Sequence, residues 1–150
     1  KKIPTFKADT TNDSVFDLEN NKKNLVIYFY PKDNTPGCTT EGENFRDLYK
    51  KFENVNAEIF GVSRESLKSH ENFKEKFKIP FELISDPQEK LCKLFDVIKE
   101  KSMYGKKYMG IERSTFLIDS NNKLIKEWRK VKVPGHAQEV LETLEEHLKS

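Results

Sequence analysis

The run from Leu25 to Tyr30 (LVIYFY) contains six consecutive apolar or aromatic residues with no polar residue between them. A strand buried on one face alternates apolar and polar side chains, whereas a strand covered on both faces does not. The run therefore predicts the central strand of an α/β sheet. Pro31 follows directly and ends it.

Strand-like and helix-like segments alternate along the rest of the chain, which indicates an α/β fold with a central mixed sheet flanked by helices. The predicted strands cover residues 57–62, 81–84, 115–119 and 124–130; the predicted helices cover residues 39–52, 66–77, 86–98 and 137–148. Residues 99–110 are charged and contain glycine, so we expect a loop there. No repeat or flexible linker interrupts the pattern, and we expect one domain over residues 1–150.

The charge pattern and the cysteine content exclude several classes of protein. Charged residues make up 35% of the chain, but lysines alternate with glutamates and the net charge is only +2, which is typical of a solvated surface and not of nucleic-acid binding. No apolar run approaches the ~18 residues of a membrane span, and the opening KKIPTFKADT lacks the apolar segment of a signal peptide. Two cysteines are too few for a secreted disulfide framework. We expect a cytoplasmic protein without a nucleic-acid or membrane partner.

Cys38 directly follows Pro36-Gly37, where the predicted strand gives way to a helix. The free backbone N–H groups and the dipole of a helix N-terminus stabilise an anion, and a cysteine in the first turn supplies one as thiolate. An inert buried cysteine at a turn is the alternative, but this local context favours a reactive thiol. Glu41 and Glu43 lie near the same helix start, where their charge complements the dipole and also opposes thiolate formation.

Two segments carry a resemblance to a known family. Pro31, Thr35 and Cys38 form P-x-x-x-T-x-x-C, which resembles the active-site signature of peroxiredoxins. The wider string YFYPKDNTPGCTTEGENFRD is similar to the bacterioferritin comigratory protein (peroxiredoxin Q) branch, as is YGKKYMGIERSTFLID, which contains Arg113. The resemblance covers most of the chain in the expected order and implies a thioredoxin-like fold.

The resemblance also implies an activity and a set of site residues. The protein would be a thiol peroxidase that reduces hydrogen peroxide and organic hydroperoxides, with thioredoxin or a similar thiol as reductant, acting as a monomer or weak dimer. Cys38 would be the nucleophile, Arg113 would stabilise its thiolate, Thr35 would hydrogen-bond the peroxide, and Pro31 would shield the sulfur from water. No metal, haem or flavin is required. The three histidines (His70, His136 and His147) have no metal-ligand spacing, and we expect His70 on a solvated helix face.

The chain departs from the branch at one position. Many members carry a second, resolving cysteine five residues after the first, and here that position is Glu43. Cys92 is the other thiol, and it is either a buried core residue or a resolving cysteine reached across a long loop. The default mechanism is therefore a one-cysteine cycle with an external thiol. A redox sensor that is oxidised at Cys38 without significant turnover is the rival function.

Overall fold

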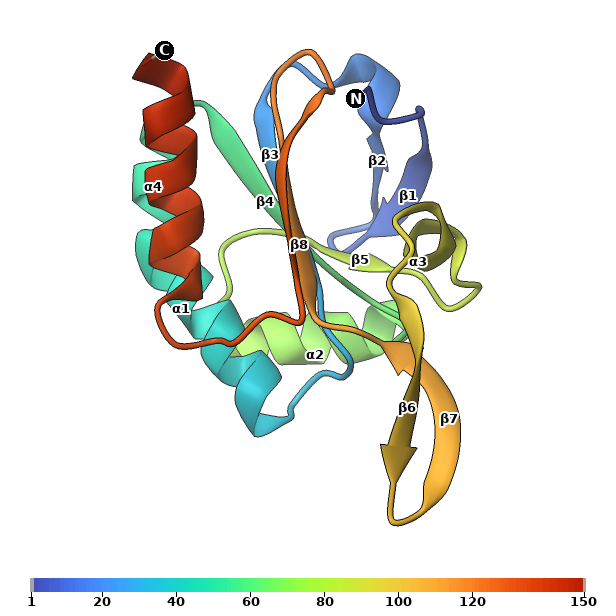
Figure 1. Ribbon diagram of the computed structural model, residues 1–150. Coiled ribbons are helices and arrows are strands. Elements are labelled where there is room, and N and C mark those ends of the chain that lie inside the picture. Colours follow the sequence, from blue (N-terminus) through green and yellow to red (C-terminus); the bar gives the residue numbers. More distant parts are fainter. Residues whose placement is uncertain (1, 150) are drawn as a thin grey trace.

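A computed structural model describes residues 2–149 (Figure 1). Its centre is a seven-stranded sheet with the order β2-β1-β5-β4-β3-β8-β9. The strands are β1 (Lys7–Thr10), β2 (Ser14–Asp17), β3 (Asn24–Phe29), β4 (Ala57–Ser63), β5 (Leu83–Ser85), β8 (Ser114–Ile118) and β9 (Leu124–Arg129). The α-helices are α1 (Pro36–Asn54), α2 (Leu67–Phe77), α3 (Lys90–Leu94) and α4 (His136–Lys149), and a short 3₁₀ helix, η1 (Leu18–Asn20), follows β2. β3 runs parallel to β4 and antiparallel to β8, so the predicted mixed sheet flanked by helices is confirmed.

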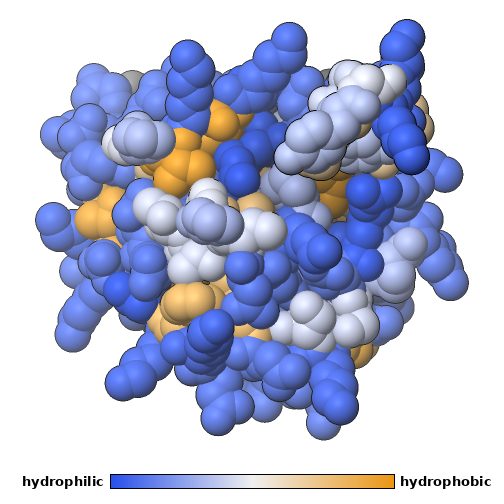
Figure 2. Space-filling model, turned by 90° about the horizontal axis from the view of Figure 1, so that it is seen from below, coloured by the Kyte–Doolittle hydropathy of each residue, from blue (hydrophilic) through white to orange (hydrophobic). Residues whose placement is uncertain are grey.

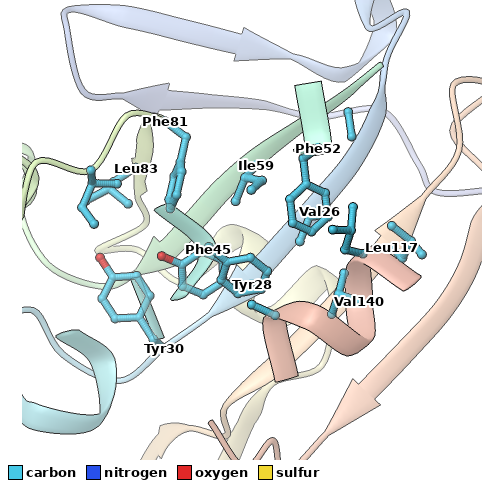
Figure 3. Packing of buried hydrophobic residues seen from close by; sticks show 14 of the residues in the cluster. Val26, Tyr28, Tyr30, Phe45, Phe52, Ile59, Phe81, Leu83, Leu117 and Val140 are labelled. Carbon is cyan, nitrogen blue, oxygen red and sulfur yellow. The ribbon is translucent and has the colours of Figure 1, made fainter. Parts of the chain in front are cut away.

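The central strand β3 is buried on both of its faces, as its sequence predicts. Val26 and Tyr28 point into one hydrophobic cluster with α1, α2 and α4, whereas Leu25, Ile27 and Phe29 point into a second cluster on the other side of the sheet. Figure 3 shows part of the first cluster, in which the rings of Tyr28 and Phe45 stack with their centroids 4.7 Å apart. β3 thereby joins two packed cores, and the loop that follows it is held by both.

The expected loop over residues 99–110 is instead a β-hairpin. β6 (Ile98–Met103) pairs with β7 (Lys106–Ile111) in a separate two-stranded sheet that projects from the body of the molecule (Figure 1). Tyr104 and Gly105 form its turn with φ of 53° and 78°, and positive φ at both positions is the geometry that matches the twist of paired strands. The prediction was wrong because the hairpin buries little of either face, so its sequence lacks the alternation that marks a half-buried strand.

The expected helix over residues 86–98 is much shorter than its apolar spacing suggested. Only α3 is helical, because Glu89 before it and Asp96 after it both have positive φ, at 62° and 55°. The carboxylate of Asp86 accepts hydrogen bonds from the backbone N–H groups of Leu91 and Cys92 at 3.2 and 2.8 Å. A side chain outside the helix therefore satisfies its first turn.

Candidate active site

The loop after β3 leads directly into the first turn of α1. Thr35 is the N-cap residue, and Pro36 opens the helix, where the missing N–H costs little because it would have no partner within the helix. The Thr35 hydroxyl donates to the Lys32 carbonyl at 2.8 Å and does not cap the helix. The positive end of α1 therefore remains available to an anion at Cys38, the third residue of the helix.

Arg113 brings a positive charge to the Cys38 sulfur. It directly precedes β8, whose first residue Ser114 pairs with Phe29 at the end of β3, so adjacent strands deliver Arg113 to the same end of the sheet. Its Nη2 donates to Cys38 Sγ at 3.3 Å, and Cys38 is only 2% exposed. Gly37 leaves room for this contact, since a Cβ there would lie 3.3 Å from Nη2. A buried cation against sulfur at a helix N-terminus is an arrangement that stabilises thiolate.

Glu41 holds the other side of the same guanidinium. Its Oε1 accepts from Arg113 Nη1 at 2.6 Å, and its Oε2 is buried without a hydrogen-bond partner. Burial raises the pKa of Glu41 to about 7 although the Arg113 charge opposes the shift. Burial also lowers the pKa of Arg113, but Glu41 and Cys38 outweigh it, so the pKa of Arg113 lies above its usual range. Glu41 thus orients Arg113, a role that the sequence interpretation missed, although its position three residues after Cys38 places both on one helix face.

Asp33, within the loop, pairs with the buried side chain of His70 of α2. His70 Nδ1 lies 2.7 Å from Asp33 Oδ2, and His70 Nε2 lies 2.9 Å from the Ile84 carbonyl oxygen. Each ring nitrogen thus lies within hydrogen-bond distance of an oxygen atom. The expectation that His70 lies on a solvated helix face was wrong: the side chain is completely buried, because the carboxylate that pairs with it comes from a loop distant in sequence.

Further hydrogen bonds satisfy the Asp33 carboxylate. The hydroxyl of Tyr30 donates to Oδ1 at 2.6 Å, and the hydroxyl of Ser69 donates to Oδ2 at 2.7 Å. Burial raises the pKa of Asp33, but His70 and these hydroxyls outweigh it, so its pKa lies below the usual range. The loop is consequently fixed to β3 and α2 at a point between Pro31 and Thr35, both of which are half-buried.

Cys92 lies on the opposite side of the sheet from Cys38. Cys38 belongs to the cluster that packs against α1, α2 and α4, and Cys92 is fully buried in the other cluster. Burial, with Asp86 as the next cause, raises the pKa of the Cys92 thiol far above its usual range. Both cysteines are free. A Cys38–Cys92 disulfide would therefore require one thiol to leave its core and pass the sheet.

Two other features are absent from residues 2–149. No group of three or more His, Cys, Asp or Glu side chains there is arranged to hold a metal ion. Within the same residues, no helix has the length and apolar character needed to cross a membrane.

Comparison with known proteins identifies the family. The model of the AhpC/TSA family matches residues 1–127. The chain belongs to the AhpC/TSA family. Peroxiredoxin Bcp of Xanthomonas campestris pv. campestris is 58% identical over 125 residues, which cover 83% of this chain and 78% of the relative. Peroxiredoxin Bcp of Bacillus subtilis is 56% identical over 124 residues, covering 83% and 79%.

Solved peroxiredoxin structures share the fold. A cysteine-to-serine variant of Xylella fastidiosa PrxQ superposes with a TM-score of 0.92 at 46% identity, covering 99% of this chain and 97% of that one. A structure of the Xanthomonas campestris bacterioferritin comigratory protein gives a TM-score of 0.90 at 50% identity, covering 95% and 91%. The protein is a peroxiredoxin of thioredoxin-like fold, an enzyme of the thiol peroxidase type, and the resemblance read from the sequence is confirmed. Such an enzyme acts on a hydroperoxide and is reduced by a thiol.

The raised pKa of Glu41 predicts a specific pH dependence of stability. Below its ordinary pKa of 4.5 the carboxyl is protonated in both the folded and the unfolded chain, so burial carries no ionic cost. As pH rises to about 7, the unfolded chain ionises first, and wild type should lose about 3 kcal/mol relative to Glu41→Gln. Urea denaturation of both proteins from pH 4 to pH 8 measures this difference. A constant difference across that range would show that Glu41 titrates normally.

The buried anchor of the loop predicts a link between Tyr30 and peroxidase rate. Tyr30→Phe removes a charge-assisted hydrogen bond to Asp33, worth about 1.5–3 kcal/mol, and should loosen the loop before Cys38. We expect the oxidation of Cys38 by peroxide to slow by roughly 10-fold, because small misplacements of reacting groups lower the reaction rate. Rapid-mixing kinetics measures this rate. Tyr49→Phe is the matched control, since it removes a tyrosine hydroxyl from the carboxylate of Glu58. Equal rates in the two variants would contradict a positioning role for the anchor.

Proposed function

We propose that Cys38 is the peroxidatic nucleophile, which reduces hydrogen peroxide and alkyl hydroperoxides and is regenerated by an external thiol, with thioredoxin as the physiological reductant. The contact of Arg113 Nη2 with Cys38 Sγ, at 3.3 Å and at the start of α1, is the observation that supports this most directly. The Xanthomonas campestris relative has been studied for alkyl peroxide reduction, which agrees with the proposed substrates.

In the first step the Cys38 thiolate attacks one peroxide oxygen. A sulfur–oxygen bond forms while the oxygen–oxygen bond breaks, and the sulfur loses two electrons to the peroxide. The departing alkoxide or hydroxide takes up the proton of the attacked oxygen, leaving sulfenate and an alcohol or water. Arg113 stabilises the negative charge that moves from sulfur to oxygen, because a fixed cation in a buried site needs no reorganisation.

Thr35 and Pro31 complete the proposed site. Thr35 already donates its hydroxyl hydrogen to the Lys32 carbonyl, so its oxygen lone pairs are left to accept a hydrogen bond from a peroxide O–H. Pro31 has no backbone N–H and limits the access of water to the sulfur. The backbone N–H of Cys38, at the positive end of α1, donates to the second peroxide oxygen.

In the second step a thiol attacks the Cys38 sulfenic acid. A mixed disulfide forms with release of water, and a second thiol resolves it, releasing a disulfide and restoring the Cys38 thiolate. The attacking thiol comes from outside the chain, because Cys92 lies buried across the sheet and Glu43 occupies the nearby helical position.

The same features support proposals on the domain, the cellular compartment and the oligomeric state. Residues 1–150 act as one domain, since the sheet combines strands from near both ends of the chain. The two free thiols suit the reducing cytoplasm, where thioredoxin is available. The chain carries its own nucleophile and cation in one protomer, so it functions as a monomer or weak dimer.

The cysteine variants test the function and its one-cysteine cycle together. Cys38→Ser should abolish peroxide consumption with thioredoxin, thioredoxin reductase and NADPH, because serine supplies no redox-active sulfur. Cys92→Ser should keep most of the wild-type turnover, since the Cys92 thiol of the wild type remains buried throughout the proposed cycle. Circular dichroism of both variants controls for folding.

Three results would count against these assignments. Turnover by Cys38→Ser would show that Cys38 is not the nucleophile. Loss of turnover in Cys92→Ser, with a Cys38–Cys92 disulfide in peptide mass maps, would make Cys92 the resolving cysteine. Oxidation of the wild type without continuing peroxide consumption would favour a redox sensor.

A further inference from the structure

Exposed apolar side chains concentrate on the β6–β7 hairpin. Among residues 2–149, seven large hydrophobic side chains are exposed, and four of them belong to this hairpin: Met103 (56%), Tyr104 (97%), Tyr108 (43%) and Met109 (56%). Figure 2 views the end of the molecule toward which the hairpin points in Figure 1, and most of the surface there is hydrophilic. By the strand register, Met103 and Tyr108 share one face of the hairpin with Lys101, whereas Met109 lies on the opposite face. The face that carries Met103 and Tyr108, with Tyr104 at its turn, forms an exposed apolar cluster, which marks a contact site.

The hairpin is also the most basic exposed element near the candidate site. Residues 98–111 contain four lysines and one glutamate, which gives a net charge of +3, larger than the +2 of the whole chain. The one glutamate, Glu100, lies 3.9 Å from Lys107. A surface with apolar side chains surrounded by lysines is complementary to a partner with an apolar contact area and an acidic rim.

The base of the hairpin adjoins the Cys38 site. Arg113 follows β7 after one intervening residue, Glu112. The Lys101 side chain lies over Gly110, where a Cβ would be 3.2 Å from Lys101 Cδ. Burial and then the charge of Arg113 lower the pKa of Lys101, which places its ammonium in the field of the site. The face of the hairpin that carries Lys101 therefore lies beside the Cys38 site.

We propose that the β6–β7 hairpin is the docking surface for an acidic protein that carries the reducing thiol. This proposal rests on the proposed function, because that function requires an external thiol at the Cys38 sulfur. Cys38 is almost completely buried and Cys92 lies in the other core, so a protein reductant must contact the rim of the site to deliver its sulfur. Hydrogen peroxide and small thiols enter without such contact.

The size of the surface favours this transient partner over a second copy of the chain. The three apolar side chains on this face and at its turn present on the order of 400 Å², given the ~150–250 Å² that a whole aromatic side chain buries. A stable interface buries about 800 Å² on each partner, whereas transient redox complexes lie at the low end of the range.

The double variant Tyr104→Ser/Tyr108→Ser tests the proposal, with Val15→Ser/Leu148→Ser as the matched control of exposed apolar positions elsewhere. Peroxide turnover is measured with two reductants, dithiothreitol and a reduced thioredoxin of net negative charge kept reduced by its reductase. We expect the hairpin variant to lose at least 10-fold in kcat/KM for thioredoxin through a raised KM. Its turnover with dithiothreitol and its rate of oxidation by peroxide should remain at the wild-type values, and the control should match wild type throughout.

Charge reversal gives a second test of the same surface. Wild-type kcat/KM for the acidic thioredoxin should fall as ionic strength rises from about 0.01 to 0.15 M, because salt screens attraction between the partners. Lys106→Glu/Lys107→Glu should lower kcat/KM at low salt and abolish that decline, again without an effect on dithiothreitol turnover.

Several outcomes would overturn the docking surface. Unchanged thioredoxin kinetics in the hairpin variants would place the contact elsewhere. An equal loss with both reductants would mean that the hairpin shapes the site itself. A concentration-dependent dimer in sedimentation that the serine variant abolishes would make a second copy the occupant. Absence of wild-type peroxide consumption with either thiol would instead refute the proposed function, and the docking surface with it.

Discussion

The site depends on one guanidinium shared between a thiol and a buried carboxylate. Arg113 donates to Cys38 through one nitrogen and to Glu41 through the other, and only the planar fork of arginine reaches both with fixed geometry. The negative charge of Glu41 offsets part of the stabilisation that Arg113 gives a thiolate. The same carboxylate also fixes the orientation of the guanidinium. In the buried site Arg113 therefore keeps one orientation, since it cannot turn away without leaving the Glu41 carboxylate uncompensated.

The sheet brings together the segments that carry Arg113 and Cys38, which are far apart in the chain. β3 is packed on both faces, so the loop that follows it starts from a rigid point, and the antiparallel neighbour β8 brings Arg113 to the same edge. The Asp33–His70 pair then fixes the loop to α2. The same double-faced packing separates Cys92 from Cys38, which supports the proposed cycle with a thiol from outside the chain.

The sequence predicted those parts of the structure that depend on local pattern. The apolar run of β3 and the placement of Cys38 in the first turn of α1 follow from neighbouring residues, and both are confirmed. The buried His70 could not be predicted, because its partner, Asp33, lies 37 residues away. The β6–β7 hairpin was missed for the opposite reason: it buries too little surface to impose a pattern on its lysines, tyrosines and methionines.

The most direct test of this account is the rate at which hydrogen peroxide oxidises Cys38 in Arg113→Ala and Arg113→Lys, measured by rapid mixing at neutral pH. If Arg113 stabilises both the thiolate and the charge passing to oxygen, alanine should slow oxidation on the order of 10- to 1,000-fold. Lysine, which keeps the charge but not the fork, should fall between alanine and wild type. Oxidation of Arg113→Ala at the wild-type rate, with its fold intact by circular dichroism, would contradict the central role assigned to this guanidinium.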